Sequence, residues 1–319
     1  MSVQARKSPF DPEQHRLETD LRSRTARRAR GLMRRMEPIM MRTPRWSSPQ
    51  AFLEDLALEM ALEKAPVRCR TLSLEPMQNR ERHETWRWLL EALAQLGPNG
   101  PLETTYVAST VGFRRAVVEL LQRLQTELTH ETALLVHHAE VLAPGVSSAL
   151  IEAWVQYAHL VPTNRMVNLL LCGALGESCA DNVHTLTLND YSSHEAARAM
   201  SSMLDANSPD GLNAAVTFSG GIPAVIDAMA QNIRRIGGIP LSTSGLMKCL
   251  GDLQPDLEEA LHWLSDKPEL ADRVEALVEA ELLPLIPELD QALINAGLVS
   301  CVGHNQVSIR APLFVSMAS

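Results

Sequence analysis

The stretch IMMRTPRWSSPQAFLEDLA, residues 39–57, joins three patterns that together decide the fold. Its first residues form a short apolar run behind Pro38, which is typical of a buried strand. Turn-forming residues follow, and from Ala51 the apolar residues recur with a helical period as far as residue 65. A strand, a loop and a helix in this order are the opening unit of a parallel sheet, because parallel strands need a crossover connection.

The same alternation continues to about residue 189. Helical periods cover residues 82–97, 111–128 and 146–159, and strand-like apolar runs cover residues 67–74, 132–138, 166–174 and 183–188. Continuous apolar strands separated by helices indicate a parallel sheet that is covered on both faces. We therefore predict an α/β class with a doubly wound parallel-sheet core.

Beyond Asp190 the strand-like runs stop. Residues 192–204 open with a cap signal at Ser193, and residues 222–238 form a helical pattern that ends at two glycines, so this region is predicted to be a helical lid. Helices are then expected at 254–264, 268–279 and 281–296, followed by two β-like runs around Gly303-His304-Asn305, a winged-helix shape. The predicted domains are a basic N-terminal helical arm (1–36), the α/β core (37–189), the lid (190–240) and a winged-helix-like domain (241–319).

Composition narrows the class of protein. The chain has 319 residues, 45% of them hydrophobic, which is enough for a substantial core and two or three structural units. No apolar run approaches the roughly 18 residues that span a bilayer, and the first thirty residues are polar and arginine-rich, so we expect a cytoplasmic protein without a membrane partner. The five cysteines are scattered without a C-x-x-C pair, so neither a disulfide framework nor a metal site is predicted.

Charge is distributed unevenly along the chain. Residues 1–45 hold twelve Lys or Arg and five Asp or Glu, a balance of +7, which leaves −16 for the rest of a chain whose net charge is −9. Residues 246–296 hold twelve acidic side chains against Lys248, Lys267 and Arg273. The expected third helix of the winged-helix region has acidic and no basic residues, so phosphate would repel it. We predict that this domain is a protein interface and does not grip DNA.

The order of these segments resembles the AAA+ ATPases of the signal-transducing (STAND) type that carry a C-terminal winged helix, a group similar to origin-recognition and bacterial conflict-system ATPases. The resemblance covers about residues 37–315. Residues 39–57 resemble the family's strand, phosphate loop and helix, where a pattern such as G-P-R-x-S-G-K-T is expected. ALLVHHAEVL (133–142) resembles the Walker B strand, NLLLCGA (168–174) the sensor-1 strand, and FSGGIPAVIDAMAQNI (218–233) the Gly-x-Pro element that opens a lid helix and contacts adenine.

The chemical groups of the family are replaced at these places. Glycines let backbone N–H groups close on a phosphate and a lysine adds charge, whereas Thr43 and Ser48 stand at glycine positions and Pro49 at the lysine position. Gln50 stands where a Ser or Thr would bind magnesium.

The Walker B acids are replaced as well. His137 and His138 occupy their positions, and neutral imidazoles do not suit a hard, oxygen-preferring cation. Because neighbouring side chains of a strand point to opposite faces, these two rings are not expected to grip one metal together. Ala174 stands where the sensor residue would be.

The resemblance thus implies a degenerate nucleotide site, made of Thr43, Arg45, Ser47, Ser48, Pro49, Gln50, His137, His138 and Ala174, with adenine contacts at Gly221, Ile222 and Pro223. An ordinary strand-to-helix turn at 43–50 and a plain helix start at 220–223 are the structural alternatives. No cofactor is expected, with weak binding of ATP or ADP left open. No catalytic residue is predicted: there is no G-x-S-x-G elbow, and in a strand the arginines beside Cys69 would face away from it.

The preferred functional interpretation is a catalytically inactive AAA+-like pseudo-ATPase, a scaffold or regulatory subunit whose partner is a homologous active ATPase, an effector or a second copy of the chain. One alternative is a nucleic-acid-binding adaptor like the origin-recognition and transposition ATPases, and another is an ATP-binding switch with an unconventional site. The arm is expected to bind an acidic protein surface or nucleic acid through its arginines, which are Arg22, Arg24, Arg27, Arg28, Arg30, Arg34 and Arg35. The structural alternative is a solvated helix that binds nothing.

Overall fold

A computed structural model describes residues 21–63, 66–98, 100–104, 106–142, 145–173, 183–204, 209–302 and 305–318. The chain divides into two compact units. Unit 2 holds residues 25–43 and 49–188, and unit 1 holds residues 44–48 and 189–319 together with the start of the first described helix. The short loop 44–48 therefore belongs to a different unit from the strand and the helix that flank it. The predicted division into four domains stays a prediction.

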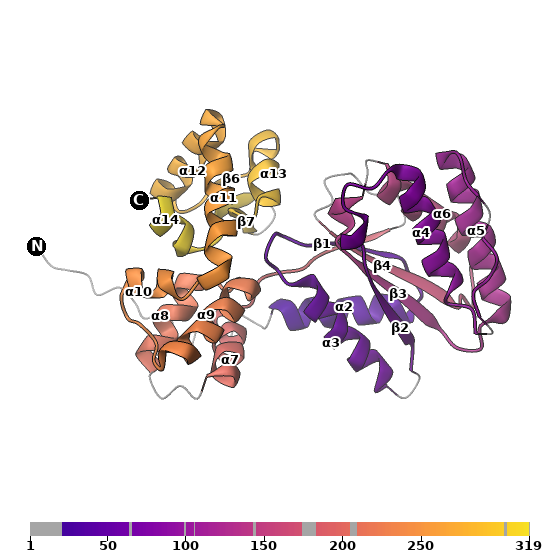
Figure 1. Ribbon diagram of the computed structural model, residues 1–319, viewed down its shortest axis with the longest axis horizontal. Coiled ribbons are helices and arrows are strands. Elements are labelled where there is room, and N and C mark those ends of the chain that lie inside the picture. Colours follow the sequence, from indigo (N-terminus) through magenta and orange to yellow (C-terminus); the bar gives the residue numbers. More distant parts are fainter. Residues whose placement is uncertain are drawn as a thin grey trace, which may run out of the picture. The chain divides into compact units, whose positions relative to one another are not determined.

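Unit 2 is built on a five-stranded sheet in which every pairing is parallel (Figure 1). Its strands are β1 (Ile39–Arg42), β2 (Arg68–Ser73), β3 (Thr132–His137), β4 (Val167–Gly173) and β5 (His184–Thr187). They lie in the order β2-β3-β4-β1-β5, so the strand before the loop 44–48 is an inner one. Each strand coincides with a predicted run, and the α/β class with a parallel-sheet core is confirmed.

Helices cover both faces of this sheet, as Figure 1 shows. The helices of unit 2 are α2 (Leu21–Arg34), α3 (Pro49–Ala61), α4 (Arg82–Ala94), α5 (Thr110–Glu127) and α6 (Val146–Leu160), with short turns η1 (Glu75–Met77) and η2 (Ala139–Val141). The first four residues of α2 are assigned to unit 1, and the helix belongs to unit 2 from Thr25 onward. Within β3, Ala133 and Leu135 pack with α2 and α3, whereas Leu134 and Val136 pack with α4, α5 and α6. Strand alternation thus divides the apolar residues between two cores, which is the doubly wound arrangement.

Unit 1 is mainly helical and has one shared apolar core. Its helices are α7 (Ser193–Met203), α8 (Pro209–Ser219), α9 (Pro223–Ile236), α10 (Thr243–Lys248), α11 (Gln254–Ser265), α12 (Pro268–Ala280), α13 (Pro287–Asn295) and α14 (Pro312–Ala318), with a turn η3 (Gly251–Leu253). As predicted, α9 ends at Gly237, which has φ +83°.

The predicted cap of α7 was wrong by one residue. Ser192, and not Ser193, is the N-cap: its Oγ accepts from the backbone N–H of Glu195 at 3.2 Å, and the Glu195 carboxylate accepts from the Ser192 N–H at 2.9 Å. Only Ser192 has a glutamate three residues later, and that spacing closes the reciprocal capping box.

The predicted helix 281–296 was too long. It begins only at Pro287, and Leu283–Pro284 instead form strand β6. Two prolines explain the difference, since Pro284 cannot donate within a helix and Pro287 suits a first helical position. Strand β6 pairs with β8 (Gln306–Ile309), which pairs with β7 (Val299–Val302), so the two predicted β-like runs are present. Gly303 and His304 of the predicted turn lie outside the described residues, and assignment as a winged helix stays a prediction.

No helix in the described part of the chain combines the length and apolar character needed to cross a membrane.

Candidate functional site

The loop 44–48, which stands where the phosphate loop was predicted, is held in unit 1 through its backbone carbonyl groups. Arg310 Nη1 donates to the carbonyl of Arg45, and the N–H of Ala224, in the first turn of α9, donates to the carbonyl of Trp46 at 3.1 Å. Arg22 donates twice, from Nη1 to the carbonyl of Ser47 at 2.8 Å and from Nη2 to that of Ser48 at 3.1 Å. Four consecutive carbonyl oxygens therefore accept hydrogen bonds from cationic or helix N-terminal donors. We call this arrangement the carbonyl clamp.

The polarity of the clamp is opposite to that of a phosphate loop. A phosphate loop directs backbone N–H groups at an anion, whereas this loop directs C=O groups at two guanidinium ions and a helix N-terminus. Trp46 and Ser48 adopt positive φ angles of 64° and 50°, which are uncommon for residues other than glycine. Pro49 is the first residue of α3 and has no N–H to offer.

Arg310 is the best-buried cation of the clamp. Its side chain is 1% exposed, and its Nε and Nη2 donate to the two carboxylate oxygens of Asp190 at 2.7 and 2.6 Å. Its Nη1 also donates to the carbonyl of Gly297 at 3.3 Å. The sequence carried no local signal for this role, since Arg310 lies 120 residues from Asp190 and 265 from Arg45.

Arg22 is the second cation. It is 7% exposed, and its guanidinium carbon lies 5.0 Å from the centre of the Tyr191 ring, a cation–π arrangement. Trp46 adds an apolar contact, with its ring centroid 5.7 Å from that of Phe314. Arg22 was predicted to bind a partner molecule, and the structure places it inside the chain's own loop contact.

The remaining loop residues of the predicted site are engaged locally. In unit 2, the Thr43 N–H donates to the carbonyl of Gly173 at 3.0 Å, which extends the pairing of β1 and β4. Gln50 donates from its side-chain amide to Glu54 Oε1 at 2.8 Å along the exposed surface of α3. Ser47 is completely buried.

The two histidines lie differently from the prediction. His138 has φ 63°, a left-handed conformation that ends the alternation of β3, and the two ring centroids are 4.7 Å apart at 60°. The expectation that the rings point to opposite faces was therefore wrong. His138 Nδ1 lies 3.1 Å from Glu140 Oε1. Burial, and then the neighbouring His138, lower the pKa of His137, so His137 is neutral near pH 7.

Among the described residues, no side chains are clustered for a metal ion at this edge of the sheet. The part of the chain that the structure describes holds no group of three or more His, Cys, Asp or Glu side chains placed to bind a metal. His137 is 3% exposed and its Nδ1 has no hydrogen-bond partner among the described atoms. Ala174, the predicted sensor position, lies outside the described residues.

The predicted adenine-contact residues are packed inside unit 1. Gly221 has φ +78°, and the Tyr191 N–H donates to its carbonyl at 2.9 Å. A Cβ atom added to Gly221 would lie 2.1 Å from the Tyr191 carbonyl oxygen. Ile222 and Pro223 are buried at the start of α9. This packing alone explains the glycine, and contact with adenine stays a prediction.

The arm arginines divide into three groups. Arg22 belongs to the carbonyl clamp. Within unit 2, Arg30 pairs with Glu59 at 3.0 Å and with Glu63 at 3.5 Å, Arg34 pairs with Glu63, and Arg35 pairs with Glu37 at 2.9 Å. The third group is Arg24, Arg27 and Arg28, which are exposed on α2. These three form the basic face that α2 offers to solvent.

Two of the described cysteines, Cys69 and Cys172, lie in environments that keep their thiols protonated at neutral pH. Burial raises the pKa of the Cys69 thiol to about 11, and burial together with the nearby Glu140 raises that of Cys172 well above its usual value. The reactive form of cysteine is the thiolate, and both environments disfavour it.

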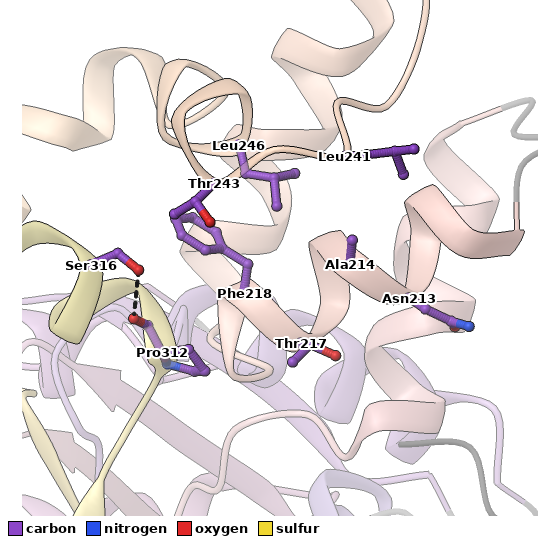
Figure 2. A pocket seen from close by; sticks show the side chains of 9 residues that line it. All are labelled: Asn213, Ala214, Thr217, Phe218, Leu241, Thr243, Leu246, Pro312 and Ser316. Carbon is purple, nitrogen blue, oxygen red and sulfur yellow. Dashed lines mark hydrogen bonds between the residues drawn. The ribbon is translucent and has the colours of Figure 1, made fainter. Parts of the chain in front are cut away.

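A pocket of about 370 Å³ lies on unit 1 between α8, the start of α10 and α14 (Figure 2). Its lining is apolar and neutral polar: Asn213, Ala214, Thr217, Phe218, Leu241, Thr243, Leu246, Pro312 and Ser316. The only hydrogen bond drawn there is internal, from Ser316 Oγ to the Pro312 carbonyl at 3.2 Å. None of these lining residues carries a charge that could pair with a triphosphate.

No protein-family model and no curated protein matches the chain. Among solved structures, the Walker-type ATPase paby2304 of Pyrococcus abyssi is similar with a TM-score of 0.58 and 12% identity, over 95% of this chain and 96% of that chain. A STAND protein with a tetratricopeptide repeat sensor, PH0952 from Pyrococcus horikoshii, gives a TM-score of 0.44 and 11% identity over 92% of this chain and 42% of that one. The Thermotoga maritima RuvB Holliday junction branch migration motor gives a TM-score of 0.43 and 12% identity over 90% of each chain. The first similarity and the parallel sheet together show that the chain has an AAA+-like fold of the P-loop NTPase type.

Proposed function

We propose that this chain is an AAA+-like protein that does not hydrolyse ATP and acts as a scaffold or regulatory subunit through protein–protein contacts. The observation that supports the proposal is the carbonyl clamp: the carbonyls of Arg45, Ser47 and Ser48 accept from arginine side chains, and that of Trp46 accepts from the N-terminus of α9. The guanidinium groups of Arg22 and Arg310 therefore already bind the backbone of the loop that would have to hold a phosphate.

The energetic reason is the direction of the dipoles. A triphosphate that approached these carbonyl oxygens would meet their negative ends, and no lysine follows to offset the repulsion. Turning the loop over would first break three hydrogen bonds from guanidinium groups. At about 1.5–3 kcal/mol for each bond to a charged group, nucleotide binding would have to offset roughly 5 kcal/mol or more.

The acidic C-terminal part favours protein partners over DNA. Helix α13 carries Glu288 and Asp290 and no basic residue. In the winged-helix assignment that we propose, α13 would be the helix that enters a DNA groove, where phosphates would repel the exposed Glu288; Asp290 is buried and paired with Arg273. The electrostatic interaction with a basic protein surface would instead be attractive, so such a partner is favoured.

Nucleotide binding and phosphate release by the purified full-length chain test the proposal. A ligand at a hundred times its Kd stabilises a folded protein by about 2.7 kcal/mol, so millimolar ATP with magnesium would visibly raise the Tm if it bound even weakly. We expect no rise in Tm and no release of phosphate.

The exposed substitution Gln50→Glu is the matched control. It adds a negative charge at the start of α3 with little change in shape, and would weaken any phosphate bound there. A nucleotide-dependent rise in Tm in the wild type that Gln50→Glu reduces would overturn the proposal and support the ATP-binding switch.

A further inference from the structure

The three-stranded sheet of unit 1 exposes an apolar face. Pro284 of β6, Gln306 of β8 and Val302 of β7 lie opposite one another in the register, so they share one face of the sheet. Around Pro284, exposed residues alternate with half-buried ones, which places Leu282 and Ile286 on the same side. Leu282, Ile286 and Val302 are 39%, 39% and 41% exposed. We call Leu282, Pro284, Ile286, Val302 and Gln306 the wing face.

The margin of the wing face is acidic. Glu281 directly precedes Leu282, Glu279 lies two residues before Glu281, and Glu288 follows Ile286 by two residues; all three are exposed. Between residues 274 and 309 the sequence contains no Lys or Arg. Asp290 is paired with Arg273 at 2.9 Å, so the three glutamates supply the free negative charge around the face. An apolar centre with a charged rim is the usual composition of a protein interface.

The geometry restricts how a partner can dock. Pro284 has no N–H, and its carbonyl accepts from Arg273 Nη2 at 2.6 Å, so the outer edge of β6 is a poor template for an added strand. Two wing faces brought together would oppose their acidic rims, and nucleic acid would meet the same repulsion. The fitting occupant is a basic polypeptide surface that covers the sheet face.

The chain itself carries a surface of this kind on α2. Arg27 and Arg28 are exposed neighbours, and Arg24 lies one turn before them on the same side of the helix. Arginine suits this contact because its aliphatic stem covers apolar surface while its guanidinium group pairs with carboxylates. No acidic side chain occurs in the sequence of α2.

We propose that the wing face binds helix α2 of a second copy of this chain, with Arg27 and Arg28 of the second copy paired to Glu281 and Glu288 and their stems covering Leu282 and Val302. The inference rests on the proposed function, in which the chain acts through protein contacts, and identifies the contact. Because it joins two different surfaces, the contact is heterologous and builds a ring or an open chain of subunits.

Charge reversal tests the pairing by sedimentation velocity of the full-length protein. The wild type is expected to self-associate with a dependence on concentration, and more weakly at high salt. The double variants Arg27→Glu/Arg28→Glu and Glu281→Lys/Glu288→Lys should each weaken association by at least about tenfold. Combining all four substitutions in one chain restores opposite charges and should recover most of the affinity.

Two further variants separate the apolar contribution from misfolding. Leu282→Ser/Val302→Ser should weaken association while leaving the rim charges intact. Reversal of the exposed Arg115, whose pair with Glu119 lies on α5, is the control and should leave association unchanged. Circular dichroism of every variant confirms that the fold is retained.

A wild type that stays monomeric at its highest soluble concentration overturns the inference, as does an Arg27→Glu/Arg28→Glu variant that assembles like the wild type. If that variant keeps its assembly and instead loses salt-dependent binding to a short DNA duplex, the basic face serves nucleic acid, which also overturns the inference. None of these results changes the nucleotide assay, so failure of this contact and failure of the proposed function are distinguishable.

Discussion

Replacing Arg310 by methionine would remove the better-buried of the two cations of the carbonyl clamp and keep most of its apolar stem. The Asp190 carboxylate would lose both of its hydrogen bonds from Arg310, and the carbonyls of Arg45 and Gly297 would lose theirs. Removing one partner of a buried ion pair costs about 3–5 kcal/mol because the other charge is left uncompensated. Since the Asp190 side chain is 18% exposed and retains some water, we expect the lower end, about 3 kcal/mol.

The assay is urea unfolding together with scanning calorimetry. For a unit of this size, about 3 kcal/mol corresponds to a fall in Tm of roughly 6–12 °C for the transition of unit 1. Adding Asp190→Asn to Arg310→Met removes the stranded charge and should recover part of the loss. The exposed pair of Arg115 and Glu119 provides the control, because Arg115→Met should not measurably change the free energy of unfolding. A loss below about 1 kcal/mol for Arg310→Met, or a double variant less stable than the single one, would refute the reasoning.

Two further predictions concern unit 1 and unit 2 in turn. Gly221→Ala should destabilise unit 1 by about 2 kcal/mol or more, because φ is +78° and the new Cβ would meet the Tyr191 carbonyl oxygen at 2.1 Å. Gly238→Ala, with nothing within 4 Å of its Cβ, is the control in the same urea titration, and equal losses would contradict the prediction. Burial, and then His138, lower the pKa of His137 from 6.5, so below pH 6.5 the unfolded chain binds a proton before the folded one does. The free energy of unfolding should therefore fall as the pH drops from 6.5 towards the lower folded pKa, and His137→Gln should flatten this dependence; parallel pH profiles for the two proteins would show that His137 is not its source.

Strands and helices of the core could be predicted because their signals are local. The run at Ile39–Arg42 is apolar and short, and the helix that begins at Pro49 shows its period within a few turns. The order of such segments also led to the AAA+-like fold. Prediction failed where two local rules competed, as at Ser192 and Ser193 where α7 begins, and where a single backbone angle decided the outcome, as at His138 with φ 63°.

The candidate site was only partly predictable. The resemblance predicts that Pro49 and Gln50 stand where a phosphate loop has its lysine and its magnesium-binding hydroxyl, and a prediction of this kind needs only one position at a time. Arg22 was singled out as one of seven arm arginines, but nothing local distinguished it from Arg27, which is exposed. Burial depends on which elements pack together, and that is a property of the whole chain.

By itself, the sequence determined the alternation of strands and helices, the absence of glycine and lysine from residues 43–50 and the opposite charges of the arm and the C-terminal part. Each of these depends on residue type and on spacing along a short segment. Only the tertiary structure decided that the loop 44–48 turns its carbonyl groups to Arg22 and Arg310, and that Leu282, Pro284 and Val302 share an exposed face. Those relations join residues far apart in the sequence, and they exist only once packing and strand register have brought the residues together.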